Sequence, residues 1–150
     1  MAAMTGGEKL QNYLRQISGK IANAGALPSV RVGFLESSGL EPGGMPTPVI
    51  AAIQEFGSRT IPPRPYFRGM IKAKGPAWGG DMGKILAGNG FDAAKTLGLM
   101  GMLIKGQLQD SITKLTSPAL APSTIRRKGF AKPLIDTGHM LSSVDYEVSA

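Results

Sequence analysis

The chain has 150 residues, the length of one domain with a core of its own. It carries 17 Lys and Arg against 10 Asp and Glu, and this net charge of +7 favours contact with acidic proteins, nucleic acid or an anionic surface. It has no cysteine, which excludes disulfides and cysteine nucleophiles and suits assembly in a reducing cytoplasm. We expect one domain over residues 1–150, with no secretion signal and no membrane-spanning segment.

The N-terminal part of the chain contains two periodic segments. Apolar residues recur at helical intervals over residues 6–24, which predicts a helix that rests on the core or on a neighbouring subunit. Residues 29–35 then alternate, with Val30, Val32 and Phe34 on one face. This alternation predicts a strand with one buried face.

The middle of the chain is rich in glycine and proline. This composition predicts loops over residues 37–48 and 75–90, with at most a weak helix near 78–87. The prolines of residues 62–65 fix an extended path, because proline cannot continue a helix from the preceding residue. A short helix is expected over 66–74.

Two further helices are predicted around these loops. Residues 49–56 form a short one, with Ile50, Ile53 and Phe56 facing inward. Residues 91–115 form the longest periodic segment and are expected to be the central helix. Its inward face is predicted to consist of Ala94, Leu97, Gly101, Ile104, Leu108, Ile112 and Leu115.

The chain is predicted to end in a strand. Residues 143–149 alternate and are the natural antiparallel partner of residues 29–35, since both segments are short and apolar on one face. Gly98 and Gly101 in the long helix would let another segment approach closely. We therefore expect an α+β fold in which a small antiparallel sheet packs on helices.

Few residues indicate catalysis. Asp136-Thr137-Gly138 is similar to the catalytic loop of aspartic proteases, in which two aspartates share a proton. Only 12 residues follow Gly138, too few for the sheet that supports this loop, so only a circularly rearranged protease would accommodate it. We interpret Asp136 instead as the cap of a short helix, with Thr137 and Gly138 in the turn. His139 is the only histidine and cannot define a zinc site, so no enzymatic activity, metal or cofactor is expected.

The densest basic cluster is Arg126-Arg127-Lys128. It is predicted to contact DNA phosphates or an acidic partner. The chain shows no helix-turn-helix, zinc-finger or RNP-type pattern. Three consecutive cations also point in different directions around a helix. The cluster therefore favours non-specific contact over reading of a DNA sequence.

Two segments carry a resemblance to a known family. The first reads Ala51-x-x-Gln54-Glu55-Phe56-Gly57, then Ile61-Pro62-x-Arg64-Pro65-Tyr66-Phe67-Arg68. The second reads Pro122-Ser123-Thr124-Ile125-x-x-Lys128-Gly129, then Pro133-Leu134-Ile135-Asp136-Thr137-Gly138. In this order, with a long helix between them, they resemble the tail-completion or neck proteins of tailed bacteriophages, a family of virion morphogenesis. The resemblance runs from about residue 48 to the C-terminus.

The resemblance implies a structural role without catalysis. Such proteins form a ring, here expected to be a hexamer or dodecamer, at the head–tail junction. Their partners are other copies of themselves, the head–tail connector and the tail tube or tail terminator proteins. The DNA passes through the ring, so non-specific contact with it is expected. The implied location is the virion, and the host cytoplasm during assembly. The alternative reading is a DNA-binding or packaging-associated phage protein.

The first motif also supplies the residues expected at subunit contacts. A proline-fixed arm holds Tyr66 and Phe67 in place at low entropic cost. Arginines around it are expected to bond carboxylates of a neighbour. The interface candidates are Glu55, Phe56, Arg59, Arg64, Tyr66, Phe67 and Arg68.

Overall fold

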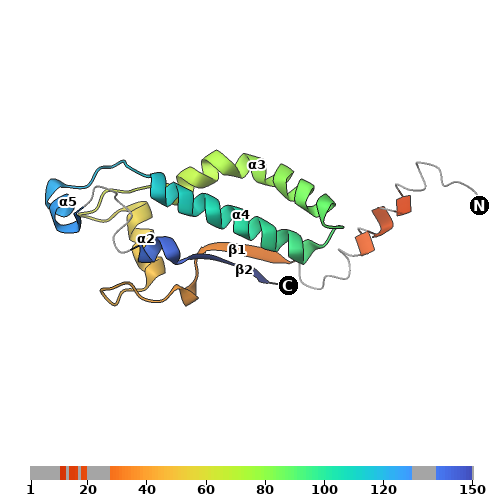
Figure 1. Ribbon diagram of the computed structural model, residues 1–150, viewed down its shortest axis with the longest axis horizontal. Helices are drawn as coiled ribbons and strands as arrows, with labels where there is room; N and C mark the ends of the chain where they lie inside the picture. The colour runs from red at the N-terminus through yellow and green to blue at the C-terminus, as the bar shows by residue number, and fades with distance from the viewer. Residues whose placement is uncertain (1–10, 13, 17, 20–27, 130–137, 150) are drawn as a thin grey trace, which may run out of the picture.

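A computed structural model describes residues 11, 12, 14–16, 18, 19, 28–129 and 138–149. Helix α4 lies between a two-stranded sheet and helix α3 (Figure 1). In chain order the elements are β1 (Ser29–Phe34), η1 (Glu36–Ser38), α2 (Thr47–Phe56), α3 (Tyr66–Gly88), α4 (Ala93–Lys114), α5 (Pro122–Lys128), α6 (His139–Ser142) and β2 (Val144–Ser149). Within these described ranges, no helix has both the length and the apolar character needed to cross a bilayer.

The sheet confirms the predicted pairing of the two chain segments. β1 and β2 run antiparallel, with Val32 opposite Tyr146 and Phe34 opposite Val144. Both pairs lie on the apolar face of the sheet, where Phe34 and Val144 join the core. The fold is thus a small α+β fold built around one long helix.

Helix α4 confirms the predicted central helix. Asp92 caps its N-terminus: the side chain accepts a hydrogen bond from the backbone N–H of Lys95 at 2.9 Å. Of the predicted inward face, Gly101, Leu108 and Ile112 are buried, whereas Ala94 is exposed. Two positions outside that prediction, Thr96 and Met100, are also buried.

Helix α3 corrects two predictions. The segment 75–90 was expected to be rich in loops and the helix after Pro65 to end near residue 74, but one helix continues to Gly88. Pro76 lies inside it and removes one backbone hydrogen bond. Packing along α4 offsets this cost and that of its glycines. Trp78 contributes by packing on the core and by donating from Nε1 to Oε1 of Gln107 at 2.8 Å.

The segment before α2 is a loop, as predicted for residues 37–48. It is closed by a bridge between Leu40 and Pro46 and by a bond of 2.9 Å from Glu41 N to Met45 O. Helix α2 begins within this range, at Thr47, with a proline in its first turn.

The inward face of α2 differs from the prediction. Its buried residues are Thr47, Ala51 and Glu55, while Phe56 is 64% exposed. The predicted inward residues Ile50 and Ile53 are only half-buried, and a carboxylate, not an aromatic ring, meets the following helix. Gly57 ends α2 with φ 79°, and a Cβ there would lie 2.8 Å from the carbonyl oxygen of Ile61.

The described residues of the predicted first helix, 11, 12, 14–16, 18 and 19, are helical. Their side chains are all exposed, including Leu14. These residues therefore do not rest on the core of their own chain. The rest of the predicted helix lies outside the described residues.

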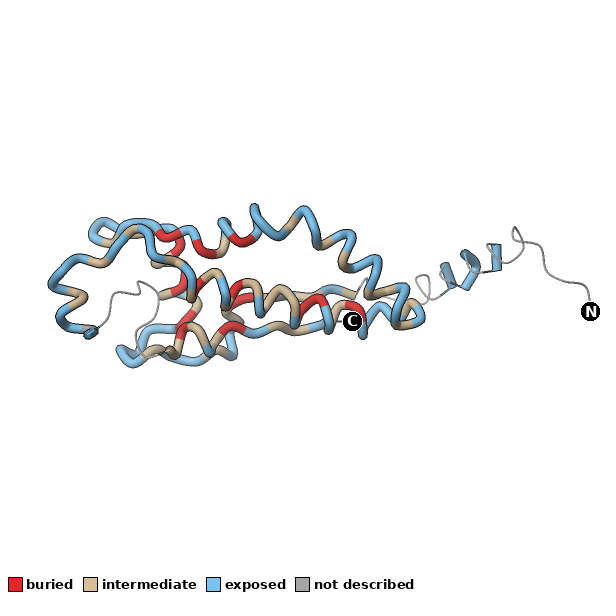
Figure 2. Tube along the Cα trace, turned by 45° about the horizontal axis from the view of Figure 1, so that its top comes forward, coloured by how far each residue is buried: buried red, intermediate tan, exposed pale blue. Residues whose placement is uncertain are grey.

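The largest group of buried residues lies toward one end of the molecule. It gathers where α2, the first turn of α3 and the second half of α4 meet the sheet, and Thr96, Met100 and Gly101 extend the buried face along the first half of α4 (Figure 2). The core cluster consists of Tyr66, Met70, Leu108, Ile112, Met140 and Val144. Beyond Met70, no residue of α3 is buried. Helix α3 is thus fixed by the core at its start, whereas α4 packs on the sheet in its first half as well, where Gly101 lies against Tyr146.

Gly101 and Gly98 form a matched pair for testing the packing of α4 on the sheet. A Cβ at Gly101 would lie 2.7 Å from Cγ of Tyr146, whereas one at Gly98 would meet nothing within 4 Å. Gly101→Ala should lower the free energy of unfolding by about 1–3 kcal/mol. Gly98→Ala should raise it by up to about 1 kcal/mol, because alanine favours the helix. Urea unfolding of both variants measures the difference, and equal effects would contradict this packing.

Candidate subunit interface

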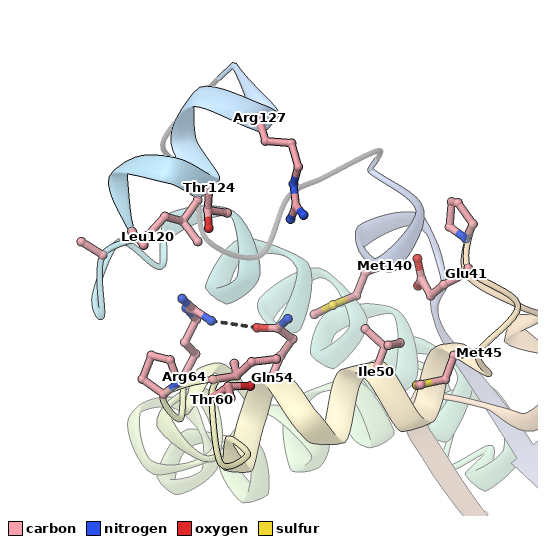
Figure 3. A pocket seen from close by; sticks show the side chains of 16 residues that line it. Glu41, Met45, Ile50, Gln54, Thr60, Arg64, Leu120, Thr124, Arg127 and Met140 are labelled. Atoms are coloured by element: carbon pink, nitrogen blue, oxygen red, sulfur yellow. Dashed lines mark hydrogen bonds between the residues drawn. The ribbon is translucent and has the colours of Figure 1, made fainter.

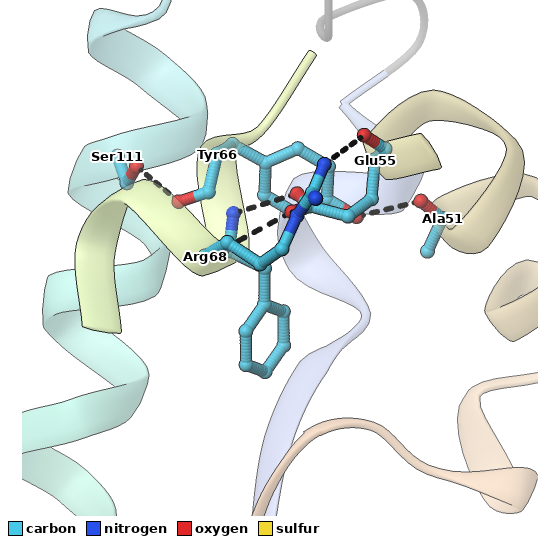
Figure 4. A network of polar contacts seen from close by, with 6 residues as sticks. Ala51, Glu55, Tyr66, Arg68 and Ser111 are labelled. Atoms are coloured by element: carbon cyan, nitrogen blue, oxygen red, sulfur yellow. Dashed lines mark hydrogen bonds and ion pairs between the residues drawn. The ribbon is translucent and has the colours of Figure 1, made fainter. Parts of the chain in front are cut away.

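Glu55 joins α2 to the start of α3. Its side chain is almost fully buried and accepts hydrogen bonds from the backbone N–H groups of Phe67 at 2.8 Å and Arg68 at 3.2 Å (Figure 4). It also pairs with Nε of Arg68 at 2.7 Å. The first N–H groups of a helix have no partner within the helix, and the helix dipole favours a negative charge there. Glu55 therefore caps α3 from the neighbouring helix.

Tyr66 locks the same junction from inside. Its hydroxyl donates to the carbonyl oxygen of Ala51 on α2 at 2.9 Å. Its own carbonyl oxygen accepts from Oγ of Ser111 on α4 at 2.7 Å (Figure 4). Burial, and after it the charge of Glu55, raise the pKa of the Tyr66 hydroxyl above its ordinary value. One buried residue thus links three helices through its hydroxyl and its backbone carbonyl.

Phe56 and Arg68 form the exposed side of this junction. The guanidinium of Arg68 lies 4.9 Å from the centre of the Phe56 ring, close enough for a cation–π contact. Beside them an open groove of about 350 Å³ lies between β1, α2 and the first turn of α3. We call it the β1 groove. Its lining is mainly apolar and includes Val32, Phe34, Pro48, Ala52, Phe56 and Phe67.

The β1 groove lies beside a strand edge. Within the described part of the chain, β1 pairs with β2 alone, so its second edge has no strand partner. Gly33 brings the strand close to the groove, because a Cβ there would lie 3.3 Å from the ring of Phe67. An open edge next to an apolar groove is a surface to which another chain can add.

The structure separates the predicted interface residues into two groups. Phe56, Phe67 and Arg68 line the β1 groove, together with the buried Glu55 and Tyr66. Arg59 is exposed and Arg64 lines a different cavity.

Three of these predicted contacts need correction. Glu55, Arg64 and Tyr66 were expected to face a neighbouring subunit, but each is at least nine-tenths buried and bonded within its own chain. Arg68 likewise has its carboxylate partner, Glu55, in its own chain. The residues that join α2 to α3 thereby position Phe56 and Phe67, which stay accessible.

The basic cluster lies on α5. Arg126 and Arg127 are both exposed, and only Arg127 lines the cavity that contains Arg64. Lys128 ends the helix. Asp136 and Thr137 lie outside the described residues. Sequence reasoning missed Glu41 and Gln54 in this region, although Gln54 stands in the first motif and could have been considered as a partner of Arg64.

His139 is half-buried at the start of α6. Its Nε2 lies 3.4 Å from Oγ1 of the buried Thr47. Across the part of the chain that the structure describes, no three His, Cys, Asp or Glu side chains come together as metal ligands.

Comparison with known proteins adds no relative. No family model matches the chain, and no curated protein and no solved structure matches it.

The capping role of Glu55 predicts a specific loss of stability. Glu55→Gln removes the charge that α3 and Arg68 bind, so the free energy of unfolding should fall by about 1–3 kcal/mol. Asp110→Asn is the matched control, since Asp110 pairs with Lys114 on the exposed surface of α4 at 2.8 Å. That change should cost no more than about 0.5 kcal/mol. If both variants lose the same free energy of unfolding in urea, the capping role of Glu55 is contradicted.

The pKa of Tyr66 predicts a loss of stability at high pH. The folded chain holds the hydroxyl proton above the ordinary pKa of 10.0, while the unfolded chain releases it near that value. Stability from this group is therefore complete below about pH 10 and falls above it, by up to about 1.4 kcal/mol per pH unit.

Tyr66→Phe should remove this part of the pH dependence, at a cost of about 1 kcal/mol for the lost hydrogen bond. Urea midpoints between about pH 9 and about pH 11 measure both effects. If the variant and the natural chain lose stability with the same slope, Tyr66 is not the group responsible.

Proposed function

We propose that this chain is a structural protein of a tailed-phage virion, one subunit of the neck or tail-completion ring that joins the tail to the head. It acts through its surfaces and catalyses no reaction. It belongs to the virion and is made and assembled in the host cytoplasm. Its partners are further copies of itself, the head–tail connector, and the tail tube or terminator.

One observation carries the proposal. Residues from both halves of the first motif meet at one junction, where Glu55 and Tyr66 fix α2 against α3. The same junction leaves Phe56 exposed beside the β1 groove and an open strand edge. A part that acts by its shape needs a rigid junction with an accessible contact next to it, and this motif provides both.

The expected contact in the ring is head-to-tail. Each subunit places a surface of its own against the β1 groove of the next, and the repeated rotation closes the ring. The apolar lining supplies affinity, and the β1 edge supplies backbone hydrogen bonds that fix the orientation. The net charge of +7 favours non-specific contact with DNA that passes through the ring.

The alternative is a DNA-binding or packaging-associated phage protein. Arg126 and Arg127 favour it, because both are exposed and neither belongs to an ion pair among the described residues. The two functions respond differently to salt. Phosphate contacts weaken steeply as salt rises, whereas an apolar subunit contact persists.

The deciding measurement is the mass of the purified, nuclease-treated protein in solution. The ring predicts a salt-resistant assembly of about six or twelve subunits. The subunit mass is 15.7 kDa. Phe56→Asp should convert this assembly to monomers, because it buries a charge in the apolar contact. Light scattering at low and high salt measures both species.

Met102→Asp is the control, since Met102 is similarly exposed but lies on α4 away from the β1 groove. It should leave the ring intact. Loss of the ring in both variants would contradict a role for the β1 groove. An aggregate that dissolves with nuclease and salt would favour the DNA-binding alternative.

A further inference from the structure

A second cavity lies on the other side of α2 from the β1 groove. It has a volume of about 790 Å³ and is bounded by α2, the proline-rich arm, residues 119–121 and α5 (Figure 3). Its wall is partly apolar, with Ile50, Leu120 and Met140 among the lining residues. We call it the arginine cavity, because Arg64 and Arg127 both line it.

Arg64 is a buried charge with neutral partners. It is only 5% exposed. Nη1 donates to Oε1 of Gln54 at 2.9 Å and Nε donates to the carbonyl oxygen of Pro118 at 3.4 Å. A guanidinium has five N–H donors, so these bonds leave most of its capacity unused. No carboxylate of the described residues pairs with it. Its burial lowers the pKa of the guanidinium, the direction expected when a cation lacks a compensating anion.

Arg127 adds a second guanidinium to the same cavity. It reaches down from α5 toward the side that holds Arg64 and Gln54 (Figure 3). It forms no ion pair within the described part of the chain. Two guanidiniums without a carboxylate partner among the described residues thus line one cavity, and guanidiniums bind carboxylates and phosphates through charge-assisted hydrogen bonds.

The opposite side of the cavity carries a carboxylate. Glu41 lies there beside Met45 and Met140 (Figure 3), and its Oε1 atom is buried without a hydrogen-bond partner. Buried polar atoms normally have a protein or water partner, so this oxygen is available to a donor that enters the cavity. The cavity thus presents a cationic end, an apolar wall and an acceptor that lacks a donor.

These features select among ligands. The phosphates of a DNA duplex lie on its outer surface and do not fit into a cavity that buries Arg64. A side-chain carboxylate on an extended peptide does fit, and a guanidinium binds it through two parallel hydrogen bonds. The chain's own charge of +7 favours an acidic partner over a second copy of itself.

We propose that the arginine cavity is the docking site for an acidic segment of a different protein. A carboxylate of that segment accepts hydrogen bonds from Arg64 and Arg127. An apolar side chain next to it packs against Ile50 and Met140, and a backbone N–H of the segment satisfies Glu41. The site is separate from the β1 groove, so the test of this proposal does not depend on whether the chain forms a ring.

The test uses the whole chain and a defined probe. The probe is the blocked tripeptide acetyl-Leu-Glu-Leu-amide, and its match has Gln in place of Glu. Binding is followed by the Nε–H signals of the arginine side chains in NMR spectra, up to about 10 mM peptide, the range of a millimolar Kd. The Glu peptide should shift the Arg64 signal saturably, and the Gln peptide should bind at least about tenfold more weakly.

Arg127→Gln should weaken binding of the Glu peptide by about tenfold. Arg126→Gln is the matched control, since Arg126 is the adjacent exposed arginine on α5 but does not line the cavity. It should leave the affinity unchanged. The proposal is overturned if no saturable shift occurs, if the Gln peptide binds equally, or if both variants weaken binding alike. It is also overturned if inorganic phosphate shifts Arg64 at lower concentration than the peptide does.

Discussion

The arrangement of this protein depends on one carboxylate at the start of one helix. Glu55, in the last turn of α2, places its carboxylate against the N-terminal amides of α3. Helix α3 begins directly after Pro65, which cannot provide a side-chain cap. Both the β1 groove and the arginine cavity are bounded by α2. The groove is also bounded by the first turn of α3, and the cavity by the segment that leads into α3. Any rotation of α2 against α3 would deform the two surfaces together. A single buried interaction therefore sets the geometry of two sites of different chemistry.

The sequence predicted those elements whose signal is local. Residues 29–35 and 143–149 alternate strictly, and they pair in the structure because both bury the same kind of face. Residues 91–115 have one apolar stripe and fold as α4. Helix α3 could not be predicted beyond its first turns, because its glycines and Pro76 disfavour a helix locally. Packing on α4 stabilises that segment, and this packing cannot be predicted from the sequence of the segment alone.

The sequence predicted which residues belong to the candidate site, but not which way their side chains point. The first motif contains the residues that meet at the junction, and this much could be read from their types and order. Which of them are buried depends on the rotation of α2, which places Glu55 inward and Phe56 outward. A change of one position along a helix turns a side chain by about 100°, from the core to solvent. The choice between the two rotations is made by α3, a separate element.

Helix α3 is not held equally along its length, which affects how easily it bends. Its first turn is anchored by Glu55, Tyr66 and Met70, whereas no residue from Ile71 to its end is buried. Glycines and a proline in this later part lower the resistance of the backbone to bending. Helix α3 is thus held more firmly at its start than toward its end. In the proposed ring, the later part of α3 would adapt to a mismatch in diameter or symmetry between two neighbouring structures, while the contacts at its start stay in place.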